Sequence, residues 1–160
     1  TQKGVVRIDA GGVSVPKAAG LPTALVTALA HDRNDDLWIG TIEGVRVLRG
    51  NTVQAIDLTA LGGGRSVFGF QQIGDAMWIS SDRGLYRYQQ GRLARVGLEQ
   101  GMPVDTVFQL VPDRVGNVWI SSNRGVLRTD MSMLNEVADG RSPSVTVERY
   151  NEIDGMANSQ

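Results

Sequence analysis

The sequence predicts an all-β fold, a partial β-propeller of about three full four-stranded antiparallel blades with half-blade pieces at its ends. The first observation is that Trp38, Trp78 and Trp119 stand 40 and 41 residues apart in near-copies of one phrase, which reads Leu-Trp-Ile-Gly-Thr in the first copy. The second is that a glycine follows each tryptophan six residues later and opens a segment of alternating apolar residues. A period near 40 residues is typical of one propeller blade.

Helical repeats of similar length are the competing interpretation. The segments around each tryptophan and the following glycine, however, are runs of five or six β-branched and aromatic residues. These runs alternate with period two and end at turn residues, and no window carries a sustained helical stripe. The pattern therefore favours strands.

The first full copy gives the order of elements expected in each blade. The inner strand covers residues 25–30, a polar turn 32–36, the second strand 37–41, the third strand 45–49 and the outer strand 52–57. Gly44, matched by Gly84 and Gly125, supplies the positive φ that the tight turn between the second and third strands needs. Gly4 opens a further copy of this half-repeat near the start of the chain.

The repeats divide the chain into five units. These are the outer strands of a preceding blade (1–19), a blade (20–60), a second blade (61–100), a third blade with a longer C-terminal connection (101–149) and the lead-in to a next blade (150–160). Propellers close with about four to eight blades. We therefore expect a piece of a longer protein that supplies further blades, or a homodimer of two pieces.

Composition excludes several function classes. The formal net charge is −1, with basic and acidic residues interspersed, which argues against nucleic acid as a partner. No apolar run reaches the roughly 20 residues of a membrane span, so a membrane is expected only through the parent protein. The absence of cysteine excludes a disulfide scaffold and thiolate zinc sites, and it suits the periplasm.

Topology predicts a binding face. In an up-and-down blade, the loop leading into the inner strand and the turn between the second and third strands lie at the same end. Polar side chains from neighbouring blades then converge at the mouth of a central tunnel, where ligands bind. The candidate ligand-binding residues are Thr23, Arg65 and Asp105 from the lead-in loops, and Glu43, Asp82, Arg83, Asn123 and Arg124 from the hairpins.

Other polar constellations have simpler structural interpretations. Asp32 to Asp36, with Glu43 at the twelfth position, superficially matches a calcium loop, but Leu37 stands where that loop needs glycine. A solvated hairpin turn is favoured, and we expect no metal. Residues 62–64, three glycines followed by Arg65, suit either an anion-binding nest or a flexible loop, and the loop is favoured because no helix follows.

Catalytic residues are scarce. His31 is the only histidine, so neither a histidine metal cluster nor a Cys/His pair is available. The serine pairs at 80–81 and 121–122 recur at the end of the second strand, and recurrence favours a structural role.

The aromatic residues are interpreted mainly as packing groups. One large ring per repeat fills the gap between twisted sheets, so Trp38, Trp78 and Trp119 are expected to anchor neighbouring blades. Tyr86 and Tyr88 lie two apart on one strand and either stack a sugar ring or pack against the next blade.

With these residues in view, the chain resembles the two-component regulator propeller repeats. The first copy carries the resemblance through Gly20-Leu21-Pro22, Asp35-Asp36, the strand Leu37 to Thr41 and Gly44-Val45. The second and third copies depart from it by having serine at the Gly-Thr positions. The resemblance extends from Gly4 to about Asp130. It implies an extracytoplasmic propeller of a bacterial histidine kinase or diguanylate cyclase, followed by a β-sandwich, with Met131 to Arg149 preceding the final blade.

The function that follows from the resemblance is a non-catalytic segment of a periplasmic ligand-sensing propeller, with no cofactor and an unknown extracytoplasmic ligand. Two alternatives stay open. One is a propeller lyase in which His31 acts as general base. The other is a structural scaffold whose blades serve dimerisation.

Overall fold

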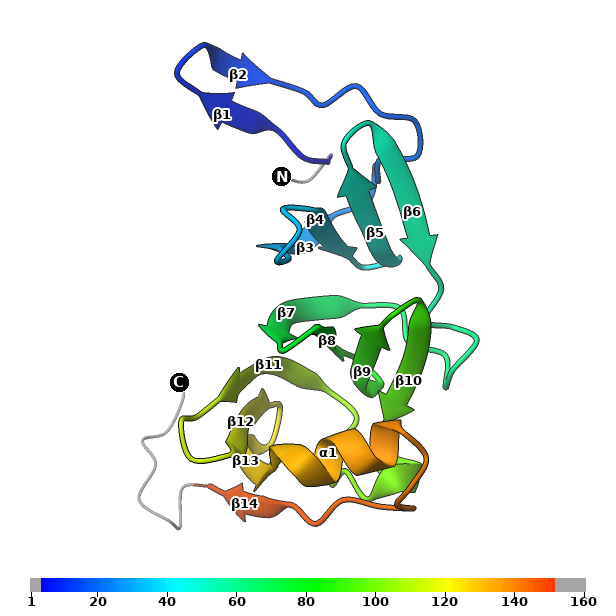
Figure 1. Cartoon of the computed structure of the whole chain (residues 1–160), viewed down its shortest axis with the longest axis vertical. Coiled ribbons are helices and arrows are strands. Elements are labelled where there is room, and N and C mark those ends of the chain that lie inside the picture. Colours follow the sequence, from blue (N-terminus) through cyan, green and yellow to red (C-terminus); the bar gives the residue numbers. More distant parts are fainter. Residues whose placement is uncertain (1–3, 152–160) are drawn as a thin grey trace.

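The computed structural model describes residues 4–151 as three four-stranded antiparallel sheets and one two-stranded hairpin (Figure 1). Strand order within each four-stranded sheet follows the chain, as in an up-and-down blade. The sheets stack one above another along the long axis, with the hairpin at the top and the third sheet at the bottom. The predicted fold class, a partial propeller of four-stranded blades, is confirmed.

The hairpin and the first sheet follow the 40-residue repeat closely. The hairpin joins β1 (Arg7–Asp9) to β2 (Gly12–Ser14). The first sheet consists of β3 (Val26–His31), β4 (Leu37–Thr41), β5 (Gly44–Arg49) and β6 (Thr52–Ile56). Every strand expected in this copy is present within one residue of its predicted bounds.

The second sheet repeats the same pattern with a shorter turn between its first two strands. It consists of β7 (Val67–Ile73), β8 (Ala76–Ser81), β9 (Gly84–Gln89) and β10 (Arg92–Val96). A single 3-10 turn, Leu98–Gln100, follows β10. Gly84 begins β9 with φ +91°, and a Cβ there would come within 2.5 Å of the Val96 carbonyl oxygen, so the hairpin requires glycine.

The third sheet contains an insertion. It consists of β11 (Val107–Pro112), β12 (Asn117–Ser122), β13 (Gly125–Asp130) and β14 (Glu148–Tyr150). The helix α1 (Met131–Ala138) stands between β13 and β14, where the other two sheets have a short turn. The expected range 150–160 thus begins with a residue of β14, and its residues 152–160 lie outside the described residues.

The helix is the main departure from the sequence analysis, which treated 131–149 as a connection without a helical stripe. Asp130 caps α1, since its side chain accepts hydrogen bonds from the backbone N–H groups of Ser132 (2.7 Å) and Met133 (3.3 Å). Leu134, Val137 and Ala138 are buried against β10 and β13. Tertiary packing therefore stabilises a helix whose eight residues are too few to show a clear apolar period.

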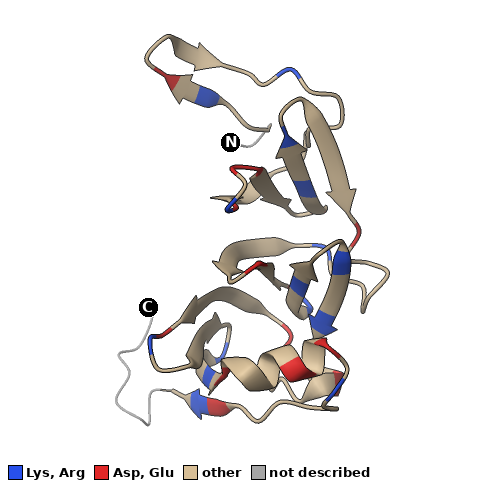
Figure 2. Ribbon diagram, viewed as in Figure 1, with Lys and Arg blue, Asp and Glu red and all other residues tan. Residues whose placement is uncertain are grey.

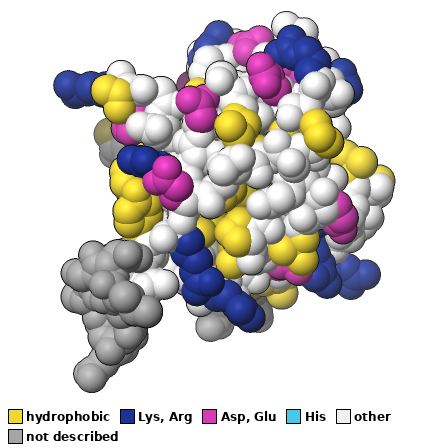
Figure 3. Space-filling model, turned by 90° about the horizontal axis from the view of Figure 1, so that it is seen from below, with side chains coloured by type: hydrophobic (Ala, Val, Ile, Leu, Met, Phe, Trp, Pro, Cys, Tyr) yellow, Lys and Arg dark blue, Asp and Glu magenta, His cyan; other side chains and the backbone are white. Residues whose placement is uncertain are grey.

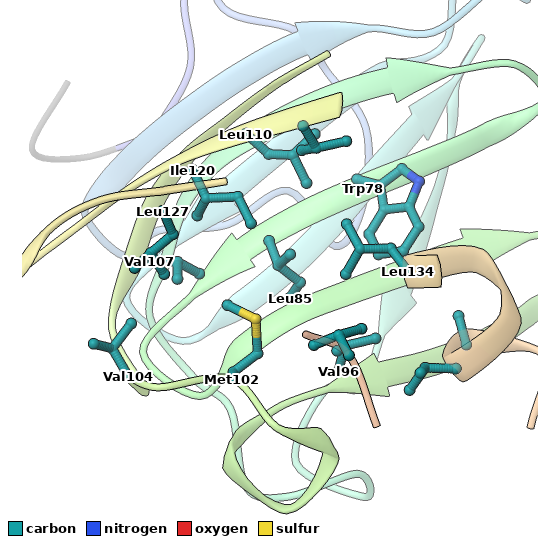
Figure 4. Packing of buried hydrophobic residues seen from close by; sticks show 14 of the residues in the cluster. Trp78, Leu85, Val96, Met102, Val104, Val107, Leu110, Ile120, Leu127 and Leu134 are labelled. Carbon is teal, nitrogen blue, oxygen red and sulfur yellow. The ribbon is translucent and has the colours of Figure 1, made fainter. Parts of the chain in front are cut away.

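The tryptophans of the first two sheets lie at the junctions between sheets. Trp38 contacts Phe70 and Tyr88 of the second sheet edge to face, with ring centroids 5.9 and 5.4 Å apart. Trp78 belongs to a second apolar cluster that includes Leu110 of the third sheet and Leu134 of α1 (Figure 4). Both tryptophans are buried.

Trp119 of the third sheet is only partly buried. Tyr150 packs beside it at 5.6 Å between ring centroids, and the Arg128 guanidinium lies 5.7 Å from its ring. Seen from below, this end of the molecule exposes hydrophobic side chains with charged residues mainly towards the rim (Figure 3).

A bulge recurs at the same place in each inner strand. The register shifts between Val26 and Ala28, and likewise within β7 and β11. Bulges bend a strand and increase its local twist, and the same irregularity recurs in all three inner strands. The bulged residues Phe68 and Phe108 contact each other edge to face at 5.3 Å.

Charged residues of both signs are distributed over all three sheets (Figure 2). Within residues 4–151, no helix has the length and apolar character needed to cross a membrane.

Candidate functional site

The predicted binding face lies at the end of the sheets where hairpins and lead-in loops meet. The first residue of each hairpin turn donates a backbone hydrogen bond to the loop leading into the inner strand. These bonds are Ile42 N to Leu25 O (3.3 Å), Asp82 N to Ser66 O (3.1 Å) and Asn123 N to Thr106 O (3.4 Å). Hairpin and lead-in loop are therefore neighbours in each sheet.

Two of the predicted acidic residues, Asp82 and Asp105, connect the hairpins to the lead-in loops by hydrogen bonds. The Asp82 carboxylate accepts hydrogen bonds from the backbone N–H groups of Arg65 (2.9 Å) and Ser66 (3.1 Å). Asp105 forms an exposed ion pair with Arg83 at 3.4 Å, and its carbonyl oxygen accepts from Gly84 N at 2.6 Å. The structure thus brings Arg65 close to Asp82 and Arg83 close to Asp105.

The remaining predicted residues are not brought together through their side chains. Among the described residues, Glu43, Asn123 and Arg124 make only backbone hydrogen bonds. Their placement as ligand-binding residues stays a prediction.

The recurring hydroxyl groups are occupied by turn hydrogen bonds. The hydroxyls of Thr41, Ser81 and Ser122 each donate to a glycine carbonyl three residues on, at 3.1, 2.8 and 2.7 Å. Each also accepts a backbone N–H from the residue two positions later. These hydroxyls stabilise the glycine hairpin.

His31 lies far from those hydroxyls, because it ends β3 at the opposite end of the first sheet. Its Nδ1 is 3.1 Å from a carboxylate oxygen of Asp35, and both side chains are exposed. Glu43 is likewise separated from Asp32 by the whole length of β4. The calcium-loop arrangement is therefore not formed.

The glycine loop at 62–64 is closed by a tyrosine. The Tyr86 hydroxyl donates to Leu61 O at 2.6 Å and accepts from Gly64 N at 3.1 Å, while Gly63 N donates to Thr59 O. Burial raises the pKa of the Tyr86 phenol above its ordinary value. Two of the nest amides are thus already bonded, and Tyr86 is not available to stack a ligand.

A cleft opens at the junction between the first and second sheets, at the end opposite the predicted binding face. Its volume is about 390 Å³, within the usual range for a small-molecule site. Trp38, Met77 and Tyr88 line its apolar side. The polar residues around it are Asp32, Arg33, Asn34, Arg49, Gln72, Asp75 and Gln90.

Both sheets contribute polar groups that are held in place. Arg33 of the first sheet donates its backbone N–H to Gln72 Oε1 at 3.1 Å, and its guanidinium donates to the Gly74 carbonyl. Arg49 is fixed by an ion pair with Asp36 at 2.8 Å. The Arg33 bonds therefore connect the turns of the two sheets at the edge of the cleft.

Gln90 is the one strained residue of the cleft. It adopts φ +50°, and among the described residues only Asp35 shares this left-handed conformation without being glycine. Such a conformation costs a non-glycine residue roughly 1–2 kcal/mol, and strained residues are concentrated at functional sites. The Gln90 side chain reaches Asp75 Oδ2 at 3.5 Å.

Asp32 and Asp113, which accept hydrogen bonds from the indole N–H groups of Trp38 and Trp119, have lowered pKa values. Asp113 accepts hydrogen bonds first from the Asn117 side chain, and also from backbone N–H groups and Trp119 Nε1, which lowers its pKa to about 2. Burial raises the pKa of Asp32, but hydrogen bonds from Trp38 Nε1 and two backbone groups outweigh it and leave the pKa below its ordinary value.

Acid is therefore expected to destabilise the fold. A carboxyl whose folded pKa lies below its unfolded value of 3.8 contributes stability above that pH and loses it as the pH falls towards the folded pKa, about 2 for Asp113. Urea unfolding measured between about pH 5 and pH 2 should show this fall. Asp113→Asn should flatten the fall, and an unchanged pH profile in that variant would contradict the assignment.

The cleft was not predicted, because its residues come from turns 40 residues apart. The topological argument applied to the hairpin end applies equally to the opposite end, and the polar turns at 32–36 and 74–75 were the available signal. Of the two tyrosines considered for stacking a ligand, Tyr88 lines the cleft, as do Asp32 and Asn34 of the segment compared with a calcium loop. Within residues 4–151, no cluster of three potential metal ligands occurs.

Stacked four-stranded antiparallel sheets with tryptophans at their junctions define this molecule as a segment of a β-propeller. Residues 20–43 match the family model of the two-component regulator propeller. The chain therefore carries a repeat of that family, as the resemblance in sequence predicted.

Two solved structures with a similar fold illustrate the likeness. The extracellular domain of the hybrid two-component system BT3049 from B. thetaiotaomicron aligns with a TM-score of 0.75 at 17% identity, over 97% of this chain and 21% of that one. PorZ of the type-IX secretion system of Porphyromonas gingivalis aligns with a TM-score of 0.66 at 15% identity, over 93% and 26%. The chain thus spans about a fifth to a quarter of these proteins. No characterised protein matched in a comparison of sequences.

Proposed function

We propose that the chain is a non-catalytic segment of a ligand-sensing propeller in the periplasmic part of a bacterial membrane signalling protein. The fold likeness to extracellular domains of hybrid two-component systems supports this proposal. In such a protein the segment would be joined to further blades, a following β-sandwich and a kinase or diguanylate cyclase.

The cleft between the first and second sheets carries the proposal. It combines an aromatic side with fixed polar groups, as small-molecule sites do. A ligand there would contact Arg49 of one sheet and Gln90 of the next. It would therefore favour one relative position of two blades, which is a mechanical change that a propeller can pass to its neighbours.

Binding without chemistry fits the available groups. The hydroxyls of Thr41, Ser81 and Ser122 are bonded within their turns, and His31 lies at the opposite end of the first sheet from Thr41. Within residues 4–151, the cleft lining contains no histidine and no serine.

Ligand screening by thermal unfolding tests the proposal. Monosaccharides, amino acids, dipeptides and nucleosides serve as probes of small polar periplasmic solutes. A molecule that binds only the folded chain stabilises it by about 2.7 kcal/mol at a concentration of about 100 Kd. We expect at least one class to raise Tm, and no shift with any class would contradict sensing by this segment.

Variants locate the site. Gln90→Gly removes a cleft side chain and relieves the left-handed backbone, so it should weaken binding without lowering stability. Arg124→Gln, at the opposite end of the third sheet, is the matched control. If Arg124→Gln abolished the shift and Gln90→Gly did not, the ligand would bind at the hairpin face instead of the cleft.

A further inference from the structure

The tryptophan of the second sheet differs from the other two in its hydrogen bonding. Trp38 Nε1 donates to Asp32 at 2.9 Å and Trp119 Nε1 donates to Asp113 at 3.2 Å. Trp78 Nε1 is buried and has no acceptor among residues 4–151. Buried donors are nearly always satisfied in folded proteins, so one without an acceptor requires a specific explanation.

The arginine opposite Trp78 has a second unmatched donor. Arg87 on β9 pairs across the sheet with Trp78 on β8. The Arg87 guanidinium donates to Asn135 Oδ1 at 3.0 Å and forms an ion pair with Asp139, both at the end of the chain that carries α1. Its Nε is buried without an acceptor among the described residues, although the side chain is only 6% exposed. Two neighbouring strands therefore present two unmatched buried N–H donors at one position of the sheet.

A cavity lies beside this arginine, between β9, β10 and the end of α1. Its volume is about 280 Å³, which is close to the lower end of the range for small-molecule sites. The side chains that line it are those of Arg87, Gln89, Gln90, Arg92 and Asp139. Four of these five carry N–H donors.

The lining of the cavity has a net positive charge, because it contains two arginines and one aspartate. Both carboxylate oxygens of Asp139 are already paired, one with Arg87 and the other with Arg141 at 2.8 Å. Arg92 is exposed, and within residues 4–151 its side chain makes no hydrogen bond or ion pair. Figure 2 shows basic residues on β9 and β10 beside α1. The cavity therefore favours an anion.

The third sheet indicates which anion fits. There the equivalent tryptophan and arginine, Trp119 and Arg128, are each bonded to a carboxylate, Asp113 and Glu148 respectively. In the second sheet one carboxylate, that of Asp139, serves the arginine and none serves the tryptophan. The second sheet thus has one carboxylate fewer at the same position of the repeat.

We propose that this cavity binds the carboxylate of a small organic acid. Its oxygens accept charge-assisted hydrogen bonds from Arg92 at the rim and from Nε of Arg87 at the base. A turn of the Arg87 side chain accompanies binding, because Nε is covered in this structure. Gln89 contributes less, since its amide already donates to Asp75 at 2.6 Å.

The acid site is separate from the cleft between the first and second sheets. Gln90 lines both cavities, whereas Arg87 and Arg92 line only this one. Binding of an acid here does not depend on the proposed sensing role, and a change at Arg92 leaves the lining of the cleft intact.

Succinate is the probe, and succinamide, its uncharged diamide, is the matched control. Isothermal titration calorimetry with the full chain at constant ionic strength should show saturable binding of succinate and none of succinamide. Arg92→Gln should weaken succinate binding by at least about tenfold, or about 1.4 kcal/mol, because it removes the donor at the rim. Arg7→Gln removes the same charge from β1 at the top of the stack and should leave binding unchanged (Figure 1).

The indole N–H resonances locate the bound acid independently. The chain has three tryptophans, so its nitrogen–proton correlation spectrum has three indole signals, which tryptophan-to-phenylalanine variants assign. Succinate should shift the Trp78 signal most, because Arg87 lies opposite Trp78. A shift confined to Trp38 would place the acid in the cleft and overturn the proposal. No succinate binding, sulfate binding as tight as that of succinate, or equal weakening in Arg92→Gln and Arg7→Gln would overturn it as well.

Discussion

Replacing Trp78 with alanine is expected to lower the free energy of unfolding by about 3–5 kcal/mol. Trp78 is 1% exposed and lies beneath Leu134 of α1, in the cluster that joins the second and third sheets (Figure 4). Removing the ring leaves a cavity that two hydrogen-bonded sheets cannot easily close. Urea unfolding followed by circular dichroism measures the loss, and a loss below about 1 kcal/mol would show that the junction is not held by this residue.

Phenylalanine substitutions separate packing from hydrogen bonding. Trp38 Nε1 donates to Asp32 at 2.9 Å, whereas Trp78 Nε1 is buried without an acceptor among residues 4–151. A hydrogen bond to a charged group contributes roughly 1.5–3 kcal/mol, so Trp38→Phe should cost more than Trp78→Phe by about that amount. The difference should shrink in acid as Asp32 becomes protonated. Equal costs at neutral pH would mean that the Asp32 bond contributes nothing.

The sequence predicted those parts of the fold that the repeat encodes locally. Strand bounds in the first copy agree within one residue, and Gly44, Gly84 and Gly125 all have positive φ. The Trp78 copy nevertheless lacks the aspartate found beneath Trp38 and Trp119, because its preceding turn is only two residues long. The short turn before Trp78 therefore leaves its indole N–H without the carboxylate acceptor that Trp38 and Trp119 have. The repeat pattern alone did not reveal this loss.

Features that depend on contacts between distant residues were not predicted. The Tyr86 hydroxyl closes the glycine loop from 22 residues away. The Asp82 carboxylate accepts two backbone hydrogen bonds from the neighbouring loop, which the sequence did not indicate. The cleft exists only because two turns from successive blades leave space between them. The sequence pattern predicts the strands and turns, but the stacking of the sheets determines which side chains contact one another.

Leu134→Ala in α1 is expected to cost about 2–5 kcal/mol, although the helix is an insertion into the blade pattern. Leu134 is fully buried against Trp78, and α1 is bound to the second sheet by Arg87. The Arg87 guanidinium donates to the Asn135 side chain at 3.0 Å and forms an ion pair with Asp139. The helix therefore joins the second and third sheets, and its loss should expose the Trp78 ring.

Glu136→Ala is the matched control, since Glu136 lies on the exposed face of the same helix. Its cost should stay within about 0.5 kcal/mol, because alanine preserves helix propensity and removes no buried contact. Tryptophan fluorescence should shift to longer wavelength in Leu134→Ala and remain unchanged in Glu136→Ala. If both variants unfolded at the same urea concentration as the parent chain, α1 would be only a surface connection and the second junction would be stable without it.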